Sequence, residues 1–145
     1  MADQNETIKL LKECDAGVKM GIQSLEDVLT GLKDGNLKNI LQQSKERHEE
    51  IKRHIDKYLK EYQEDGKEPA AIATMMAKMK EGFKMMTEES SCAAANLIID
   101  GCNMGIKSIY KYLNQYPNAD KKIQKLVDEI VQEEEQLCKE LRAYL

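Results

Sequence analysis

Two ionisable residues, His48 and Glu134, interrupt apolar helical patterns and could do chemistry. Each lies in a run where apolar residues recur every three or four positions, as on one face of an α-helix. A buried imidazole or carboxylate without a partner costs several kcal/mol, so each needs one. Three interpretations remain open. The two side chains bond each other or polar groups such as Ser44, Tyr58 or Tyr144; they hold a metal; or the apolar faces are misassigned and both are exposed.

The metal interpretation brings in two cysteines. Iron or zinc, like other transition metals, accepts imidazole, carboxylate and thiolate ligands. Cys14 and Cys102 lie on the apolar faces of two other expected helices, so the candidate metal ligands are His48, Glu134, Cys14 and Cys102. A simpler interpretation makes the cysteines small buried hydrophobic residues. No nucleophile has an adjacent base, so no catalytic residue is predicted, and no cofactor besides a metal is indicated.

The other ionisable residues near the two candidates are expected to be solvated. Glu50 and His54 are four residues apart, a spacing that pairs side chains on a helix surface. In the run Glu133 to Glu135, only the middle residue falls on the apolar face. These charges are therefore interpreted as a hydrated helix surface.

A repeated phrase organises the helices that carry these residues. Residues 20–24 read Met-Gly-Ile-Gln-Ser, residues 104–108 read Met-Gly-Ile-Lys-Ser, and Gly17 and Gly101 each precede the methionine by three positions. Further along, at an offset of 86 residues, apolar positions still correspond, and His48 corresponds to Glu134. We therefore predict a helical hairpin present in two copies, about residues 5–64 and 89–145, within one domain spanning 1–145.

The glycines of the two phrases predict close packing. A glycine inside a helix costs up to about 1 kcal/mol relative to alanine. Two glycines one turn apart, repeated in the second phrase, indicate that another helix approaches closely there. We expect the repeat to place Met20 opposite Met104 in a shared interior.

Breaks in the apolar pattern set the expected helix ends. Gly35 suits a left-handed C-terminal cap, and Asn36 can cap the next helix. Thr87 or Ser90 can cap the third helix, Pro117 ends it, and Asn118 can cap the fourth. The expected helices cover about residues 5–33, 37–64, 88–116 and 119–145.

Residues 65–88 form a long crossover between the two hairpins. Their apolar pattern predicts a short amphipathic helix whose apolar face is mostly methionine. This face either packs on the bundle or forms an adaptable docking surface for a protein partner or a second copy of the chain, as in a homo-oligomer. The candidate partner-binding residues are Met75, Met76, Met79, Phe83 and Met86. The crossover is long enough to make the third helix parallel to the second, and an up-down-up-down bundle is the alternative.

Two hairpins, a long crossover and matching glycine phrases resemble the ferritin-like superfamily. More narrowly, the chain resembles small bacterial ferritin-like proteins of unknown function with a leading Leu-x-x-Cys-x-x-Gly pattern, here Leu11, Cys14 and Gly17. The resemblance implies an all-α, ferritin-like four-helix bundle. Its di-metal sites take one Glu from each of two helices and a Glu-x-x-His unit from each of the others.

No Glu-x-x-His unit occurs in this sequence, so the resemblance implies a degenerate di-metal site. The predicted function is a non-catalytic interaction or structural module. The alternative is a metal-binding or redox ferritin-like protein with an altered site around His48 and Glu134.

Composition limits the partners and the compartment. The net charge of −4 and the pI near 5.3 argue against nucleic acid, which requires a basic face. No apolar run approaches the roughly 20 residues needed to cross a bilayer, so no transmembrane segment is expected. The first residues are polar and resemble no signal peptide. We therefore expect a cytoplasmic protein with reduced cysteines.

Overall fold

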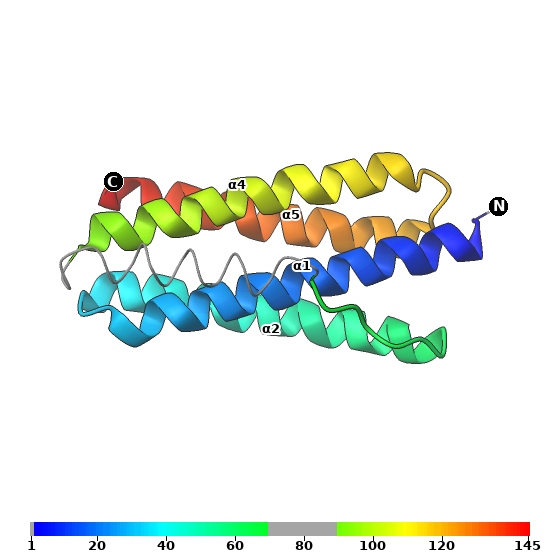
Figure 1. The fold of residues 1–145 in the computed structure, drawn as a ribbon, viewed down its shortest axis with the longest axis horizontal. Coiled ribbons are helices and arrows are strands. Elements are labelled where there is room, and N and C mark those ends of the chain that lie inside the picture. Colours follow the sequence, from blue (N-terminus) through cyan, green and yellow to red (C-terminus); the bar gives the residue numbers. More distant parts are fainter. Residues whose placement is uncertain (1, 70–89) are drawn as a thin grey trace.

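The computed structural model describes residues 2–69 and 90–145. These residues fold into four long helices and one terminal 3-10 turn, and no strand occurs among them (Figure 1). The all-α class is confirmed, and the arrangement is consistent with a four-helix bundle. The elements are α1 (Gln4–Gly31), α2 (Gly35–Glu61), α4 (Ser91–Gln115), α5 (Lys121–Leu141) and η1 (Arg142–Tyr144).

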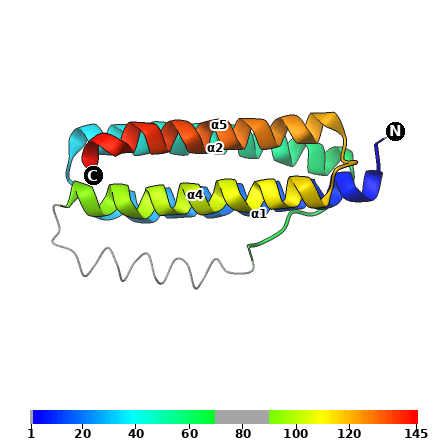
Figure 2. The ribbon, with the colours of Figure 1, turned by 90° about the horizontal axis from the view of Figure 1, so that it is seen from above.

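The four helices lie in two layers, α1 beside α4 and α2 beside α5 (Figure 2). Helix α2 returns antiparallel to α1, and α5 returns antiparallel to α4 (Figure 1). Helix α4 starts at the end of the bundle where α1 finishes, so it runs in the same direction as α2. Each helix therefore lies between two antiparallel neighbours.

Side-chain caps fix the start of each helix in the described part of the chain. The prediction for Ser90 is confirmed, since its hydroxyl accepts from the Ala93 N–H. The predictions for Asn36 and Asn118 are wrong. Asp34 caps α2 and Asp120 caps α5 in their place. A carboxylate both accepts the free N–H groups and favours the positive end of the helix dipole. The four caps are Asp3, Asp34, Ser90 and Asp120.

The predicted left-handed cap at Gly35 is also wrong. No described glycine has a positive φ, and Gly35 is the first residue of α2 rather than the end of α1. Helix α1 ends at Gly31, and Leu32 continues in extended backbone. The chain therefore turns between α1 and α2 without the glycine that the sequence suggested for that role.

The core consists of two apolar clusters at the two ends of the bundle. One gathers residues such as Leu11, Ile55, Ile123 and Val127, and the other residues such as Leu25, Leu41, Leu137 and Leu141. Both come from the helix faces that the apolar periodicity predicted. The level of the bundle between the clusters carries the buried polar residues Ser44, His48, Glu133 and Glu134. This polar level positions the candidate site.

The described start of the crossover is anchored by a buried carboxylate, Asp15. Its Oδ2 atom lies 2.8 Å from Lys19 Nζ and accepts from the Lys67 N–H at 2.9 Å, and its Oδ1 atom lies 3.0 Å from Lys52 Nζ. A Cβ added at Gly66 would lie 2.3 Å from Asp15 Oδ2. Only glycine fits there, so the close approach explains Gly66.

The predicted docking surface lies outside the described residues. It comprises Met75, Met76, Met79, Phe83 and Met86, all within 70–89. The docking role of these residues stays a prediction.

Candidate functional site

His48 and Glu134 bond each other at the centre of the bundle. His48 Nε2 lies 2.5 Å from Glu134 Oε1, and His48 Nδ1 lies 2.8 Å from the Ser44 carbonyl oxygen. His48 is 2% exposed and Glu134 is 9% exposed. The interpretation that the two side chains satisfy each other is confirmed. The interpretation that they lie on the surface is wrong.

The surroundings favour the charged form of the histidine. Both ring nitrogens face oxygen acceptors, so both donate in the protonated ring. Burial alone lowers the pKa of His48, but the hydrogen bond to Glu134, the charge of that carboxylate and the Ser44 carbonyl together raise the pKa above its usual value. The result is an imidazolium–carboxylate pair with no net charge.

A second glutamate of α5 also bonds to α2. Glu133 accepts from Ser44 Oγ at 2.8 Å and from Arg47 Nε at 2.6 Å, and it is 8% exposed. The prediction that Glu133 belongs to a hydrated surface is therefore wrong. Ser44 and Arg47 follow each other by three residues on α2 and so present their donors to one carboxylate. This contact fixes α5 against α2 beside the central pair.

His54 also differs from its prediction. Its Nδ1 atom lies 3.5 Å from Glu129 Oε2 on α5, and both side chains are about half exposed. The predicted pairing of His54 with Glu50 on the same helix is replaced by a pairing between helices. The contact remains at the surface, where an ion pair contributes little.

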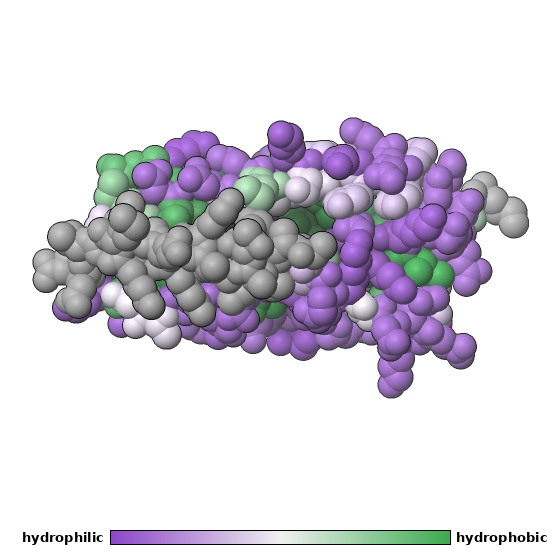
Figure 3. Space-filling model, in the orientation of Figure 1, coloured by the Kyte–Doolittle hydropathy of each residue, from purple (hydrophilic) through white to green (hydrophobic). Residues whose placement is uncertain are grey.

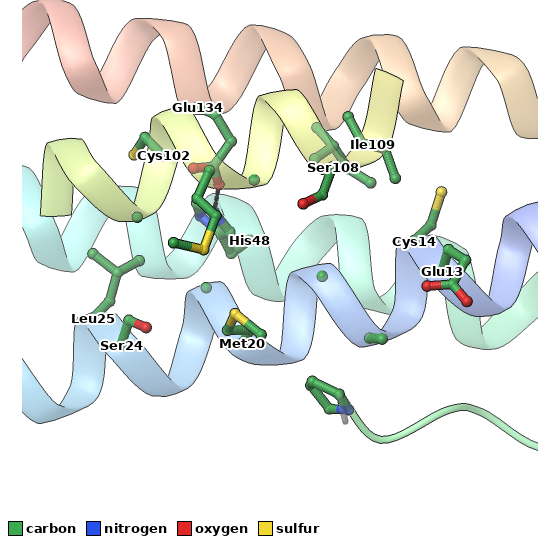
Figure 4. A pocket seen from close by; sticks show the side chains of 18 of the residues that line it. Glu13, Cys14, Met20, Ser24, Leu25, His48, Cys102, Ser108, Ile109 and Glu134 are labelled. Carbon is green, nitrogen blue, oxygen red and sulfur yellow. Dashed lines mark hydrogen bonds and ion pairs between the residues drawn. The ribbon is translucent and has the colours of Figure 1, made fainter. Parts of the chain in front are cut away.

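A cavity of about 330 Å³ lies between α1 and α4 and reaches the His48–Glu134 pair. Apolar side chains are visible at the bottom of the hollow between these helices (Figure 3). His48 and Glu134 come from the second layer, behind α1 and α4 (Figure 4). Both repeated phrases contribute to the wall, through Gly17, Met20, Gly21, Ser24, Gly101, Met104, Gly105 and Ser108.

Close packing between described residues is found at only one of the four glycines of the repeated phrases. A Cβ added at Gly17 or Gly101 would meet no described atom within 4 Å, and one added at Gly105 would meet only Glu134 Oε2, at 4.0 Å. Gly21 differs, because its Cβ would lie 3.0 Å from His48 Cδ2. All four glycines line the space between α1 and α4, and of these Gly21 alone packs tightly against a described side chain, the histidine ring.

The expected interior pairing of the two methionines is also wrong. Met20 and Met104 both line the cavity, but Met104 is 50% exposed. Gly17 and Gly105 are exposed as well, so the cavity reaches the surface. Because side chains are missing from the facing helices, the methionines lie along an open hollow rather than in a shared core.

The candidate cysteines are buried thiols in the cavity wall. Cys102 lies beside Glu134, whereas Cys14 lies farther along α1 (Figure 4). Burial, with the charges of neighbouring acids, raises the pKa of Cys14 to about 12. Burial, then the charge of Glu134 and a hydrogen bond with that carboxylate, also raise the pKa of Cys102. Both cysteines are therefore protonated at neutral pH, which disfavours metal coordination and nucleophilic attack.

The four candidate ligands do not form one cluster. Within residues 2–69 and 90–145, no group of three or more His, Cys, Asp or Glu side chains is arranged to hold a metal ion. His48, Glu134 and Cys102 lie near one another, and Cys14 lies apart from them (Figure 4). Metal binding by His48 and Glu134 stays a prediction.

Comparison with family models, with curated proteins and with solved structures finds no match for this chain. Membership of the ferritin-like superfamily therefore stays a prediction from the sequence. None of the described helices is both long enough and apolar enough to span a bilayer.

The geometry suits binding rather than covalent chemistry. The cavity wall follows α1 from Glu13 to Leu25, a length of about 18 Å at 1.5 Å per residue. The wall is mostly apolar, with one buried polar pair whose imidazole has both nitrogens bonded. Such a site can enclose an elongated apolar molecule and offer it one point of polar contact.

Proposed function

We propose that this protein is a non-catalytic binding module of ferritin-like architecture, and that its central cavity takes up a small apolar molecule. The cavity of about 330 Å³ between α1 and α4 carries the proposal. Ligand pockets in proteins span about 300–1,000 Å³ and are mainly apolar, with a few placed polar groups. The cavity falls at the lower end of that range, so the ligand is small.

The glycines support a binding role. Each costs its helix up to about 1 kcal/mol relative to alanine. Packing accounts for this cost at Gly21, which contacts the His48 ring, but not at Gly17 or Gly101, where a Cβ would meet no described atom within 4 Å. A ligand in the cavity would account for the cost of these two glycines, which packing between described residues does not explain.

The ferritin-like part of the proposal draws on helix direction and on the central polar level. Helix α4 runs in the same direction as α2, as a single long crossover requires (Figure 1). Where di-metal proteins direct carboxylates inward from all four helices, this chain has Gly21, His48, Gly105 and Glu134. Two glycines in place of two acids would turn a di-metal centre into a cavity.

Binding is tested by fluorescence titration with N-phenyl-1-naphthylamine, a small apolar dye that brightens in an apolar site. Gly101→Leu places a side chain in the cavity and should weaken dye binding at least tenfold. Gly35→Ala is the matched control, because Gly35 lies outside the cavity and its added Cβ would meet no described atom. Absence of saturable binding, or equal binding by Gly101→Leu, would contradict the proposal.

The second candidate function is binding of a transition metal, such as iron or zinc, at His48 and Glu134. The observation in its favour is the 2.5 Å contact between the two side chains, with Cys102 beside them. Dialysis against iron, zinc or manganese followed by metal analysis tests it. One metal per chain that disappears in His48→Ala would support this function. Substoichiometric metal that His48→Ala leaves unchanged would exclude it.

An interaction role through the methionine-rich segment is a separate proposal. The molecule bound by this segment would be a protein partner or a second copy of the chain in a homo-oligomer. Light scattering of the purified chain measures the second possibility directly, since a dimer doubles the mass of 16.6 kDa.

A further inference from the structure

We infer that the molecule in the cavity carries a neutral hydrogen-bond donor, as an aliphatic alcohol does, and that this donor bonds to Glu134 Oε2. The inference rests on the proposed binding function and names the ligand class. It concerns the second oxygen of a carboxylate whose first oxygen is already bonded to His48.

Glu134 Oε2 can accept from a ligand even though the Cys102 thiol also hydrogen-bonds to the Glu134 carboxylate, because a thiol is a weak donor and a carboxylate has about four acceptor positions. Glu134 lines the cavity, and its Oε1 atom is bonded to His48. The Oε2 atom lies 4.0 Å from the point where a Gly105 Cβ would be. Because Gly105 has no side chain, that residue leaves Oε2 uncovered at the cavity wall, where Cys102 is its neighbour.

The other polar group of the pair cannot serve the ligand. His48 Nε2 is bonded to Glu134 and Nδ1 to the Ser44 carbonyl. An imidazolium has no further donor, and it has no acceptor. Polar recognition at the bottom of the cavity is therefore left to a carboxylate oxygen, which selects molecules that donate.

Charge then distinguishes between donors. His48 and Glu134 together carry no net charge, so an ammonium group entering the cavity would lose its hydration without gaining a free counter-charge. A carboxylate group on the ligand would be disfavoured even more strongly than an ammonium group. Of the described residues that line the cavity, Lys67 and His48 are the cationic ones, and each is paired, with Glu13 and Glu134 respectively. A neutral hydroxyl avoids both costs.

The shape of the cavity favours a chain-like molecule. Its wall extends for about 18 Å along α1, with the buried side chains of Leu25, Ile98 and Leu137 beyond the polar pair and Cys14 and Ile109 before it. An alkyl chain of about eight carbons can lie along these side chains with its hydroxyl at Glu134. Ser24 and Ser108 also line the cavity and are the competing polar partners for the ligand, and the Cys102 thiol is the competing donor to Glu134.

Competition for the bound dye tests the inference with four compounds of similar size. They are 1-octanol, heptyl methyl ether, octylammonium and octanoate. A hydrogen bond to an ionised acceptor corresponds to roughly a tenfold or greater gain in affinity. We expect 1-octanol to compete at least about tenfold better than the isosteric ether, and better than either ion.

Two variants locate the acceptor. In Glu134→Gln the amide oxygen can still accept from His48, and the amide N–H₂ group then faces the cavity, so the preference for 1-octanol over the ether should fall below about twofold. The double variant His48→Leu with Glu134→Leu removes the acceptor and leaves neither charge of the pair unpartnered, so it should bind the dye and show no preference. Glu135→Gln is the matched control, because Glu135 is the adjacent exposed residue on α5 and lies outside the cavity wall.

The possible outcomes separate the two proposals. If neither the dye nor any of the four compounds binds, the proposed function fails. If the dye binds and the alcohol and ether compete equally, the function stands and the inference is overturned. A preference that survives Glu134→Gln but disappears in Ser24→Ala or Ser108→Ala would also overturn it, by assigning the contact to a serine hydroxyl.

Discussion

Replacing Gly17 and Gly101 with alanine should stabilise the protein. Both glycines lie inside long helices, α1 and α4, where alanine is the better helix former. A Cβ at either position would meet no described atom within 4 Å. No steric cost from residues 2–69 and 90–145 therefore opposes the gain in helix propensity.

The expected magnitude follows from the helix propensities. Each substitution should add about 0.5–1 kcal/mol to the free energy of unfolding. Because Gly17 and Gly101 lie on different helices and their added atoms share no described neighbour, the double variant should gain about 1–2 kcal/mol. For a chain of this size, each kcal/mol raises the melting temperature by about 3–4 °C.

Gly21→Ala is the matched control on the same helix. Its Cβ would lie 3.0 Å from His48 Cδ2 and 3.2 Å from His48 Nε2, so the ring must move. That movement disturbs the contact with Glu134, and the variant should be less stable than the wild type. Urea unfolding followed by circular dichroism measures the three single variants and the double variant under identical conditions.

The close-packing hypothesis makes the opposite prediction. If α1 and α4 touch at the glycines, as their spacing in the sequence first indicates, each added methyl group overpacks the interface. Such overpacking typically costs about 1–3 kcal/mol. Loss of stability in Gly17→Ala and Gly101→Ala, similar to that in Gly21→Ala, would refute the cavity.

Three further predictions concern the buried charges. Glu134→Leu should cost about 3–5 kcal/mol because it leaves the imidazolium of His48 unpaired, and adding His48→Leu should recover most of that loss in urea unfolding. The folded-state pKa of His48 is raised, so its pairing stabilises the protein fully below the unfolded-state pKa of about 6.5. This contribution disappears as pH rises through the folded-state pKa, so the wild type should lose stability relative to the double Leu variant as pH rises above about 6.5. Burial alone raises the pKa of Asp15, but the bonds from Lys19, Lys52 and the Lys67 N–H lower that pKa, so the Asp15 carboxylate stabilises the fold above about pH 3.9 and this stabilisation is lost on further acidification. Gly66→Ala, which places a methyl group against the same carboxylate, should cost about 1–3 kcal/mol at neutral pH.

The helices could be predicted from the sequence because apolar residues recur with the period of a helix. The ends were less accessible, since Asp34 and Asn36 are both good caps and the sequence does not say which one takes the extended conformation. The direction of α4 could not be derived either. The connecting segment is long enough for either topology, and packing of the two hairpins decides between them.

The central pair was located by sequence reasoning because His48 and Glu134 both interrupt apolar faces and correspond at one offset in the repeat. Glu133 was missed, since it adjoins the apolar face rather than lying on it. Ser44 and Arg47, three residues apart on the facing helix, were the available signal for its burial. Asp15 was missed too, although its four-residue spacing from Lys19 marked a paired carboxylate.

The meaning of the glycines could not be derived from the sequence. A glycine in a helix reports only that a side chain is missing, and the same residue serves a close helix contact or a hollow. Which of the two occurs depends on the distance between α1 and α4, set by the packing of all four helices. Gly21 and Gly101 belong to the same repeated pattern, yet one touches His48 and the other faces the cavity.

The most direct test of the glycine-lined binding cavity is a titration of the ¹⁵N-labelled protein with 1-octanol, followed through the glycine amide resonances. The account predicts saturable shifts at Gly17, Gly101 and Gly105, which line the cavity, and none at Gly31 or Gly35, which lie outside it. Equal shifts at both sets, or no shift at the cavity glycines, would contradict it.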